Sequence, residues 1–226
     1  MKMPPRPKFE KQEVLDAALK IVRESGEEAL TARRLADELG CSTRPIFTLF
    51  QGMQDVKEQL YPVVGDFFVE FCNRYRDYMP PFKGFGIALV DFASTEPHLF
   101  CYYAVSRPGQ ERGIEGWLST PMADAARKTL MGSYHLDQET ASCLFKEMWL
   151  HTFALCMIKV THAADFSDEE ISQSLSRSFA SLLMLAKSGG LVGQNRDGVI
   201  SDLLDNPVSL APAAPIEPLP ERCLSC

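Results

Sequence analysis

Residues 30–50 read LTARRLADELGCSTRPIFTLF, and this stretch predicts two short helices joined by a tight turn. Thr31 is a favourable N-cap for the first helix, because its side chain can accept a hydrogen bond from a backbone N–H of the first turn. Gly40 follows the last apolar residue of this helix and can adopt the left-handed conformation that commonly ends one. The first helix is therefore expected to stop at a turn formed by Gly40 and Cys41.

The second short helix is expected over residues 43–50, with Ser42 as its N-cap and Pro45 in its first turn, where a missing N–H does little harm. A longer amphipathic helix is predicted over residues 10–25, because apolar residues recur there at intervals of three and four and Gly26 ends the pattern. Three helices in this order are typical of a helix-turn-helix module, whose second short helix enters the major groove of DNA.

The predicted second helix has one face for packing and one for binding. Ile46, Leu49 and Phe50 share the face that can pack against the helix of residues 10–25. Arg44, nearer the opposite face, is the expected reader of a base, because its guanidinium can donate two hydrogen bonds to one guanine. Side chains at the helix N-termini lie where backbone N–H groups favour phosphate oxygens. The expected DNA-facing residues are Thr31, Arg33, Ser42, Thr43, Arg44, Phe47 and Thr48.

The run from Glu13 to Val56 resembles the DNA-binding domain of TetR/AcrR-family transcriptional regulators. The resemblance rests on residues that agree in one order: Ala17-Ala18, Gly26, Leu30-Thr31, Leu35-Ala36, Leu39-Gly40, Ser42 and Ile46-Phe47-x-x-Phe50. It implies a homodimeric regulator, usually a repressor, whose larger helical domain binds a small molecule and thereby changes the spacing of the two recognition helices. The partners it implies are double-stranded DNA, a second copy of the chain and a small apolar or amphipathic effector.

Three positions depart from the pattern of that family. Phe47, Leu49 and Met53 stand where Tyr, His and Lys are common, and each change removes a possible phosphate contact. Lys57, one turn later, and the basic arm of residues 6–11 are the candidates to replace those contacts. The alternative that these departures leave open is a helical binding protein that has lost DNA affinity and acts through a protein partner.

Helical spacing continues through the rest of the chain. A long helix is expected over residues 53–78, with a kink or break near Leu60 because Pro62 lies inside it. Ser167 and Glu170 form a capping box that starts the last helix. Further helices are expected at residues 82–95, 97–106, 116–131, 138–161 and 168–187.

No pair of strands is predicted, so the expected fold is all-α. Residues 1–55 are expected to form the helix-turn-helix DNA-binding domain, and residues 56–188 a helical effector-binding and dimerisation domain. The resemblance implies that the last two long helices of each subunit pair in a four-helix arrangement. Residues 189–226 are rich in proline and lack periodicity, which predicts a flexible tail.

Aromatic and methionine side chains crowd the second of these domains. Most are expected to lie in the hydrophobic core. As a group they also suit an apolar pocket with a few polar anchors. The expected ligand-binding residues are Phe71, Tyr75, His98, Tyr102, Tyr103, Trp117, Met148 and His151.

The distribution of charge and the cysteines indicate where a polyanion would bind and which compartment is expected. The 226 residues carry a net charge of −7, but residues 1–60 are neutral, with ten Lys and Arg against ten Asp and Glu, so contact with a polyanion is expected only there. Seven scattered cysteines favour reduced thiols and a cytoplasmic protein. No apolar run is long enough to span a membrane, and no secretory signal is recognised.

No residue pattern typical of catalysis or metal binding stands out. His135, His151 and His162 are not at paired ligand spacing. Cys223 and Cys226 have C-x-x-C spacing, but no second pair completes four zinc ligands. Glycine-rich phosphate loops, G-x-S-x-G and H-E-x-x-H are absent from the sequence. The sequence therefore indicates a binding protein, not an enzyme, and predicts no cofactor.

Overall fold

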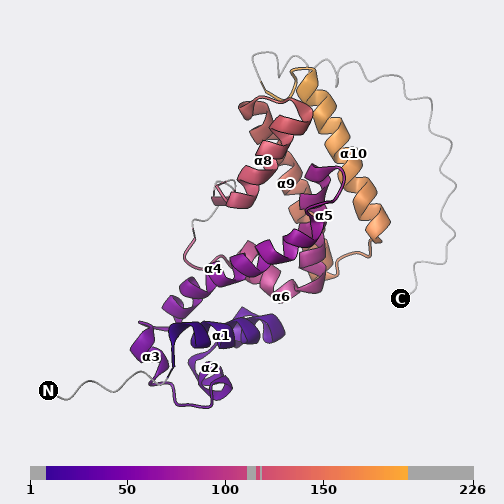
Figure 1. Ribbon diagram of the computed structural model, residues 1–226. Helices are drawn as coiled ribbons and strands as arrows, with labels where there is room; N and C mark the ends of the chain where they lie inside the picture. Colours follow the sequence, from indigo (N-terminus) through magenta and orange to yellow (C-terminus); the bar gives the residue numbers. More distant parts are fainter. Residues whose placement is uncertain (1–8, 111–115, 118, 193–226) are drawn as a thin grey trace, which may run out of the picture.

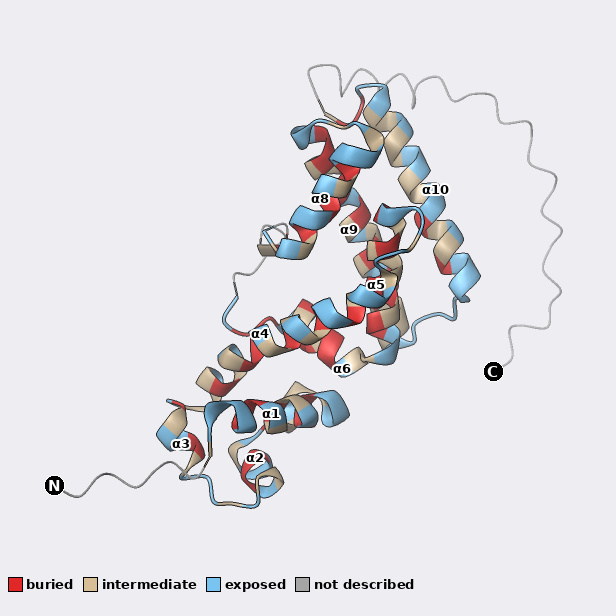
Figure 2. Cartoon of the chain, viewed as in Figure 1, coloured by how far each residue is buried: buried red, intermediate tan, exposed pale blue. Residues whose placement is uncertain are grey.

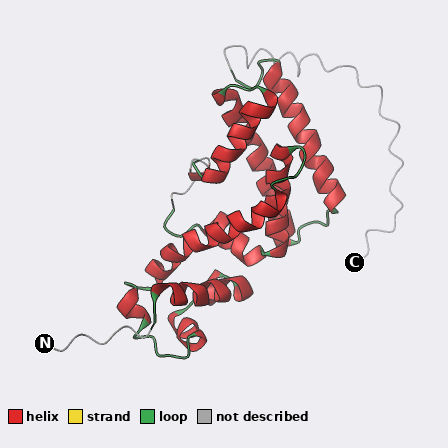
Figure 3. Cartoon of the chain, viewed as in Figure 1, coloured by secondary structure: helices red, strands yellow, loops and turns green. Residues whose placement is uncertain are grey.

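The computed structural model describes residues 9–110, 116–117 and 119–192, and within these ranges the chain forms helices and no strands (Figures 1 and 3). The prediction of an all-α protein is therefore confirmed. None of the helices in these ranges has the length and apolar composition that a bilayer span requires. The basic residues 6 and 8 and the Cys223/Cys226 pair, to which the sequence analysis assigned possible roles, lie outside the described residues.

The helices are connected by short turns, with one-turn 3-10 helices at Glu27–Ala29 and Asn73–Tyr75 and a π-helical turn at Cys101–Ser106. In chain order they are α1 (Lys11–Ser25), α2 (Ala32–Glu38), α3 (Ile46–Leu49), α4 (Met53–Cys72), α5 (Pro81–Thr95), α6 (Pro97–Phe100), α8 (Pro121–Tyr134), α9 (Gln138–Thr161) and α10 (Asp168–Lys187).

Helices α1, α2 and α3 form an N-terminal unit at one end of α4 (Figure 1). The Thr31 side chain accepts a hydrogen bond from the backbone N–H of Arg34 at 3.2 Å, so the predicted cap of α2 is confirmed. Gly40 has φ +61°, the left-handed conformation expected at this turn. The core of the unit consists of side chains with 2% exposure or less: Val14, Ala18, Ile21, Val22, Leu35, Ile46 and Phe50.

The second short helix is smaller than predicted. Ser42 does not cap it; α3 begins at Ile46, after Pro45, and has only four residues. The physical reason is Pro45 itself, because a proline disfavours the helical conformation of the residue before it, here Arg44. Residues 43–45 form a turn instead, and the Thr48 hydroxyl donates a hydrogen bond to the Arg44 carbonyl at 3.0 Å.

Helix α4 runs unbroken from Met53 to Cys72 with Pro62 inside it, so the helix ends before the predicted residue 78, and of the predicted kink or break near Leu60 the break does not occur. Pro62 is exposed, and so is Glu58, whose carbonyl loses its N–H partner because proline has none. On this surface water can hydrogen-bond that carbonyl, which lowers the cost of keeping the helix intact.

Helices α5, α8, α9 and α10 form the body, in which α9 packs against the other three (Figure 1). The bounds of α9 and α10 agree with the predicted helices at 138–161 and 168–187. Helix α8 begins later than the predicted residue 116, because Thr120 caps it by accepting a hydrogen bond from the N–H of Ala123 at 3.2 Å. The predicted helix at 97–106 is divided into α6 and the π-helical turn.

The start of α10 is fixed by the predicted capping box. The Ser167 hydroxyl accepts a hydrogen bond from the Glu170 N–H at 3.3 Å, and the Glu170 carboxylate accepts one from the Ser167 N–H at 2.8 Å. The Ser167 N–H and the Ser167 hydroxyl, which donates to the same carboxylate at 2.7 Å, hold the pKa of Glu170 below its usual value. The backbone N–H groups of Ser167 and Glu170, which would otherwise lack partners, are therefore hydrogen-bonded within the first turn.

Replacing Ser167 by alanine is expected to lower the free energy of unfolding by about 1 kcal/mol, because the cap of α10 is lost. Ser181→Ala, in the exposed middle of the same helix, is the matched control and should not lower it, since alanine is the better helix former. Urea unfolding of both variants tests the expectation, which fails if Ser167→Ala is as stable as the parent chain.

Candidate functional site

The surface of α2 and α3 presents the predicted DNA-facing side chains. Thr31, Arg33, Ser42, Thr43, Arg44, Phe47 and Thr48 are all exposed, and Phe47 is 45% exposed (Figure 2). Ile46 and Phe50 point the other way and are buried, so the face assignments made from the sequence are confirmed. Within the described part of the chain, no hydrogen bond or ion pair engages the guanidinium groups of Arg33 and Arg44.

Helix α3 is anchored to its neighbours by polar contacts at its end. The backbone N–H of Gln51 donates to the Asp55 carboxylate at 2.8 Å, and this bond holds the pKa of Asp55 below its usual value. Lys11 Nζ lies 5.3 Å from the centre of the Phe50 ring and donates to Gln59 at 3.2 Å. Lys11 therefore contacts α4 instead of extending away as part of an arm.

Lys57 has a different position from the other predicted DNA-binding residues. Its ammonium pairs with the Glu27 carboxylate at 2.9 Å, and its carbonyl accepts a hydrogen bond from the Tyr102 hydroxyl at 2.6 Å. The other Glu27 oxygen accepts a hydrogen bond from Ser106. Lys57, on α4, thus lies between Glu27 of the N-terminal unit and the π-helical turn.

A second set of contacts links α1 to the body. The Arg23 guanidinium donates to both oxygens of Glu96, with Nε at 2.8 Å from Oε2, and stacks 5.2 Å from the centre of the Phe67 ring. His98 packs on Gly26, where an added Cβ would come within 3.3 Å of the imidazole. We call the contacts of Arg23, Glu96, Glu27, Lys57 and Ser106 the junction.

His98, a predicted ligand-binding residue, lies next to Gly26 and lines neither of the two pockets described below. Gly26 has φ +80° and begins the 3-10 helix that carries Glu27. A side chain at this position would be strained by its backbone conformation, and its Cβ would crowd the His98 imidazole. The glycine predicted to end α1 therefore also permits close approach of the body.

Four more of the predicted ligand-binding residues belong to an aromatic cluster. Tyr103 stacks on Tyr61 at 5.1 Å between ring centres and meets Trp117 edge-on at 5.6 Å. Phe71 meets Phe92 edge-on at 5.2 Å. Tyr102 is fully buried and makes the hydrogen bond to Lys57 described above. These rings fill the core, and burial raises the pKa of Tyr103 to about 12.

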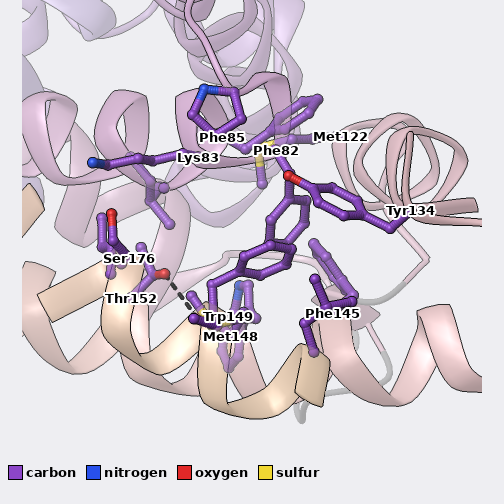
Figure 4. A pocket seen from close by; sticks show the side chains of 17 residues that line it. Phe82, Lys83, Phe85, Met122, Tyr134, Phe145, Met148, Trp149, Thr152 and Ser176 are labelled. Atoms are coloured by element: carbon purple, nitrogen blue, oxygen red, sulfur yellow. Dashed lines mark hydrogen bonds between the residues drawn. The ribbon is translucent and has the colours of Figure 1, made fainter. Parts of the chain in front are cut away.

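A largely apolar pocket of about 320 Å³ lies among α5, α8, α9 and α10; we call it the body pocket (Figure 4). Met148 is the one predicted ligand-binding residue that lines it. The Thr152 hydroxyl donates to the Met148 carbonyl at 2.7 Å, and Lys83 Nζ is engaged with Ser172 at 2.6 Å. The aromatic residues of its wall are Phe82, Phe85, Tyr134, Phe145, Trp149 and Phe179.

A second pocket, of about 410 Å³, lies where the end of α4 meets α5 and α8, and Tyr75 lines it. The Tyr75 hydroxyl donates to Asp91, and burial together with this carboxylate raises the pKa of Tyr75 to about 12. Burial also raises the pKa of Cys72, in the same wall, to about 12. A thiol with that pKa is protonated at neutral pH, so Cys72 is not suited to nucleophilic chemistry.

His151, the last predicted ligand-binding residue, lies between α9 and α10. Its Nε2 is 3.2 Å from the Ser174 hydroxyl and 3.3 Å from that of Ser178. Among the residues that the structure describes, no group of three His, Cys, Asp or Glu side chains is arranged to hold a metal ion. The arrangement of both pockets favours binding of an apolar molecule.

Comparison with protein-family models, with curated protein sequences and with solved structures finds no match to this chain.

The body pocket is expected to bind N-phenyl-1-naphthylamine, an uncharged dye whose emission rises in apolar surroundings. Leu183→Trp, in the pocket wall, should abolish most of that rise by filling the space. Arg177→Trp, at an exposed position of α10 outside the wall, is the control and should retain it. Equal emission from the two variants in a dye titration would contradict the assignment of the pocket.

Proposed function

We propose that this protein is a ligand-responsive, DNA-binding transcriptional regulator of the TetR/AcrR kind, which acts as a homodimer on a near-palindromic operator. In this proposal it is a repressor that a small apolar or amphipathic effector releases from DNA. The observation that carries the proposal is the α2–α3 surface, where Arg44 and its polar neighbours are exposed on a module whose apolar face is buried. The half-sites would be about 34–36 Å apart, one turn of the duplex.

Exposed apolar side chains on α9 and α10 support a dimer. Leu150 is 45% exposed and Met184 is 74% exposed. After Leu175, no residue of α10 is fully buried, although this half of the helix is mostly apolar. The partly buried apolar residues of this half that do not line the body pocket are Leu182, Leu185 and Ala186. Such a surface is typical of an interface with a second copy, which supports pairing through these helices.

The proposed mechanism is a coupling between the body and the α2–α3 surface. The junction connects α1 to the start of α6 through Arg23 and Glu96, and connects Glu27 to α4 and the π-helical turn. A ligand that moves α5, α6 or the turn would therefore displace the N-terminal unit. If ligand and operator favour different placements of that unit, each weakens binding of the other by the same free energy.

A cytoplasmic location is part of the proposal. None of the five described cysteines forms a disulfide. Burial raises the pKa values of Cys72, Cys101 and Cys156, which favours protonated, unreactive thiols. Thiols of this kind suit a reducing compartment, where a regulator would meet DNA.

A second candidate function is a helical binding protein that has no DNA affinity and acts through a protein partner. Two observations favour it. Lys57 is paired with Glu27 and is not available to replace a phosphate contact, and Phe47 is an exposed aromatic residue on a helix of only four residues. Exposed aromatic side chains are common in protein interfaces.

DNA binding is expected to depend on Arg44. Arg44→Ala should weaken binding to DNA from the upstream intergenic region by about 1–3 kcal/mol, because a bidentate contact to a base is lost. Arg76→Ala, at an exposed arginine directly after the 3-10 helix Asn73–Tyr75, should bind like the parent chain. The measurement is a gel-shift titration at two salt concentrations, in which affinity should fall as salt rises.

Absence of any shift at low salt, or a shift that does not respond to salt, would contradict the regulator and favour the second candidate. Equal affinity of Arg44→Ala and the parent chain would remove Arg44 from the binding surface. Either result would leave the all-α fold unaffected.

A further inference from the structure

Arg107 ends the π-helical turn in an unusual backbone conformation. Its φ and ψ are +48° and +55°, the left-handed region that few residues other than glycine and asparagine occupy. Its N–H donates to the Tyr102 carbonyl at 3.0 Å, which closes the turn, and Arg107 is only 8% exposed. The same left-handed conformation ends α8 at His135 and α9 at His162, so at Arg107 it marks the end of the helical turn.

The Arg107 guanidinium is buried without an anionic partner. Its Cζ lies 4.7 Å from the centre of the Trp117 ring. Nε and Nη1 are both buried and make no hydrogen bond within the described part of the chain, and no carboxylate there forms a salt bridge with them. A buried cation without a paired anion is strongly unfavourable, so an anion is expected to complete this site.

The rings around Arg107 do not supply that anion. Burial raises the pKa of Tyr61, and the positive charge of Arg107 together with a hydrogen bond between the two side chains only partly opposes this effect. Burial also raises the pKa of Tyr103, which stacks on Tyr61, to about 12. Both phenols are therefore neutral at pH 7, and the cation is enclosed by uncharged aromatic groups.

A third unpartnered donor lies near the same indole. Trp149 meets Trp117 with 5.5 Å between ring centres, and its Nε1–H is buried and makes no hydrogen bond. Trp149 also lines the body pocket (Figure 4). Among the described residues, every buried side-chain polar atom that lacks a partner is thus an N–H donor close to Trp117. A group of donors without acceptors fits a ligand that brings acceptor oxygens.

We propose that Arg107 is an anion-recognition residue and that the ligand of this protein is a small organic acid with an apolar body. The carboxylate accepts a charge-assisted hydrogen bond from one of the two unpartnered donors of Arg107, Nε–H or an Nη1–H. The apolar part lies along Trp117 and Trp149 towards the body pocket. That this acid is also the effector rests on the proposed function, whereas its binding does not.

Lys83, the cation in the wall of the body pocket, is the competing candidate for the carboxylate. Its ammonium is engaged with Ser172 at 2.6 Å, and Figure 4 shows it directed away from the aromatic side chains of the pocket. Arg107 has two unpartnered donors in a buried site, where a charge-assisted hydrogen bond is stronger than in water. The acid is therefore assigned to Arg107.

Intrinsic fluorescence can test the site directly, because the two tryptophans of the chain are both part of it. The full chain is titrated with three acids and their uncharged alcohol counterparts: hexanoate and hexanol, 4-phenylbutyrate and 4-phenylbutanol, and 1-naphthoate and 1-naphthalenemethanol. In at least one pair, the acid should bind about tenfold more tightly than the alcohol, since the carboxylate gains hydrogen bonds from a charged donor. Arg107→Met should bind both members alike, and Lys83→Met should keep the preference.

Thermal unfolding distinguishes a ligand-binding role from a structural one. Without ligand, Arg107→Met should have a melting temperature equal to or above that of the parent chain, because an unpaired buried charge is removed. A clear drop that Glu111→Gln or Glu115→Gln reproduces would mean that the chain supplies its own anion, and would overturn the proposal. Absence of an acid preference in all three pairs, or its loss in Lys83→Met alone, would also overturn it.

Failure of this inference is distinguishable from failure of the proposed function. Acid binding that depends on Arg107, in a chain that shows no salt-dependent DNA shift, would refute the regulator and support the anion site. A DNA shift that depends on Arg44, in a chain without acid preference, would do the reverse.

Discussion

The two-pronged pair between Arg23 and Glu96 links α1 of the N-terminal unit to the start of α6. Glu96 is largely buried, with 12% of its side chain exposed, so the pair is shielded from solvent more than an ordinary surface ion pair. Glu27 adds a second link, because it binds Lys57 and Ser106 at once. The proposed coupling between the body and the α2–α3 surface passes through these two links.

The body combines two environments that serve binding in different ways. The body pocket is apolar, and α9 contributes Phe145, Met148 and Trp149 to its wall. Beside it, the aromatic cluster encloses the Arg107 guanidinium, and Trp117 contacts both Arg107 and Trp149. Tyr102, one turn before Arg107, bonds to the carbonyl of Lys57 in the junction. The π-helical turn and Arg107 therefore supply both buried aromatic rings and a cation, and Tyr102 of the same turn also contacts Lys57.

Features set by local interactions could be predicted from the sequence, and features set by packing could not. Thr31 and Ser167 cap their helices as predicted, because a cap needs only its own first turn. The predicted extent of α3 was wrong. Ser42 was expected to be its N-cap, but Pro45 disfavours a helical conformation at Arg44, the residue before it. The walls of the two described pockets draw residues from several helices, and of the predicted ligand-binding residues Met148 lines one of them and Tyr75 the other. Arg107 has no local signal, since its burial depends on Trp117 and Tyr61 from other segments.

The account depends on the N-terminal units of two subunits being held by their bodies and moved by the ligand. The most direct measurement is the distance between spin labels placed at residue 43 of each subunit, through an unnatural amino acid, by pulsed electron resonance. The account predicts one narrow distribution of label-to-label distances at about 34–36 Å on operator DNA. When a bound acid releases the DNA, this distribution should shift. A chain without dipolar coupling between labels, or a distance that the acid leaves unchanged, would contradict it.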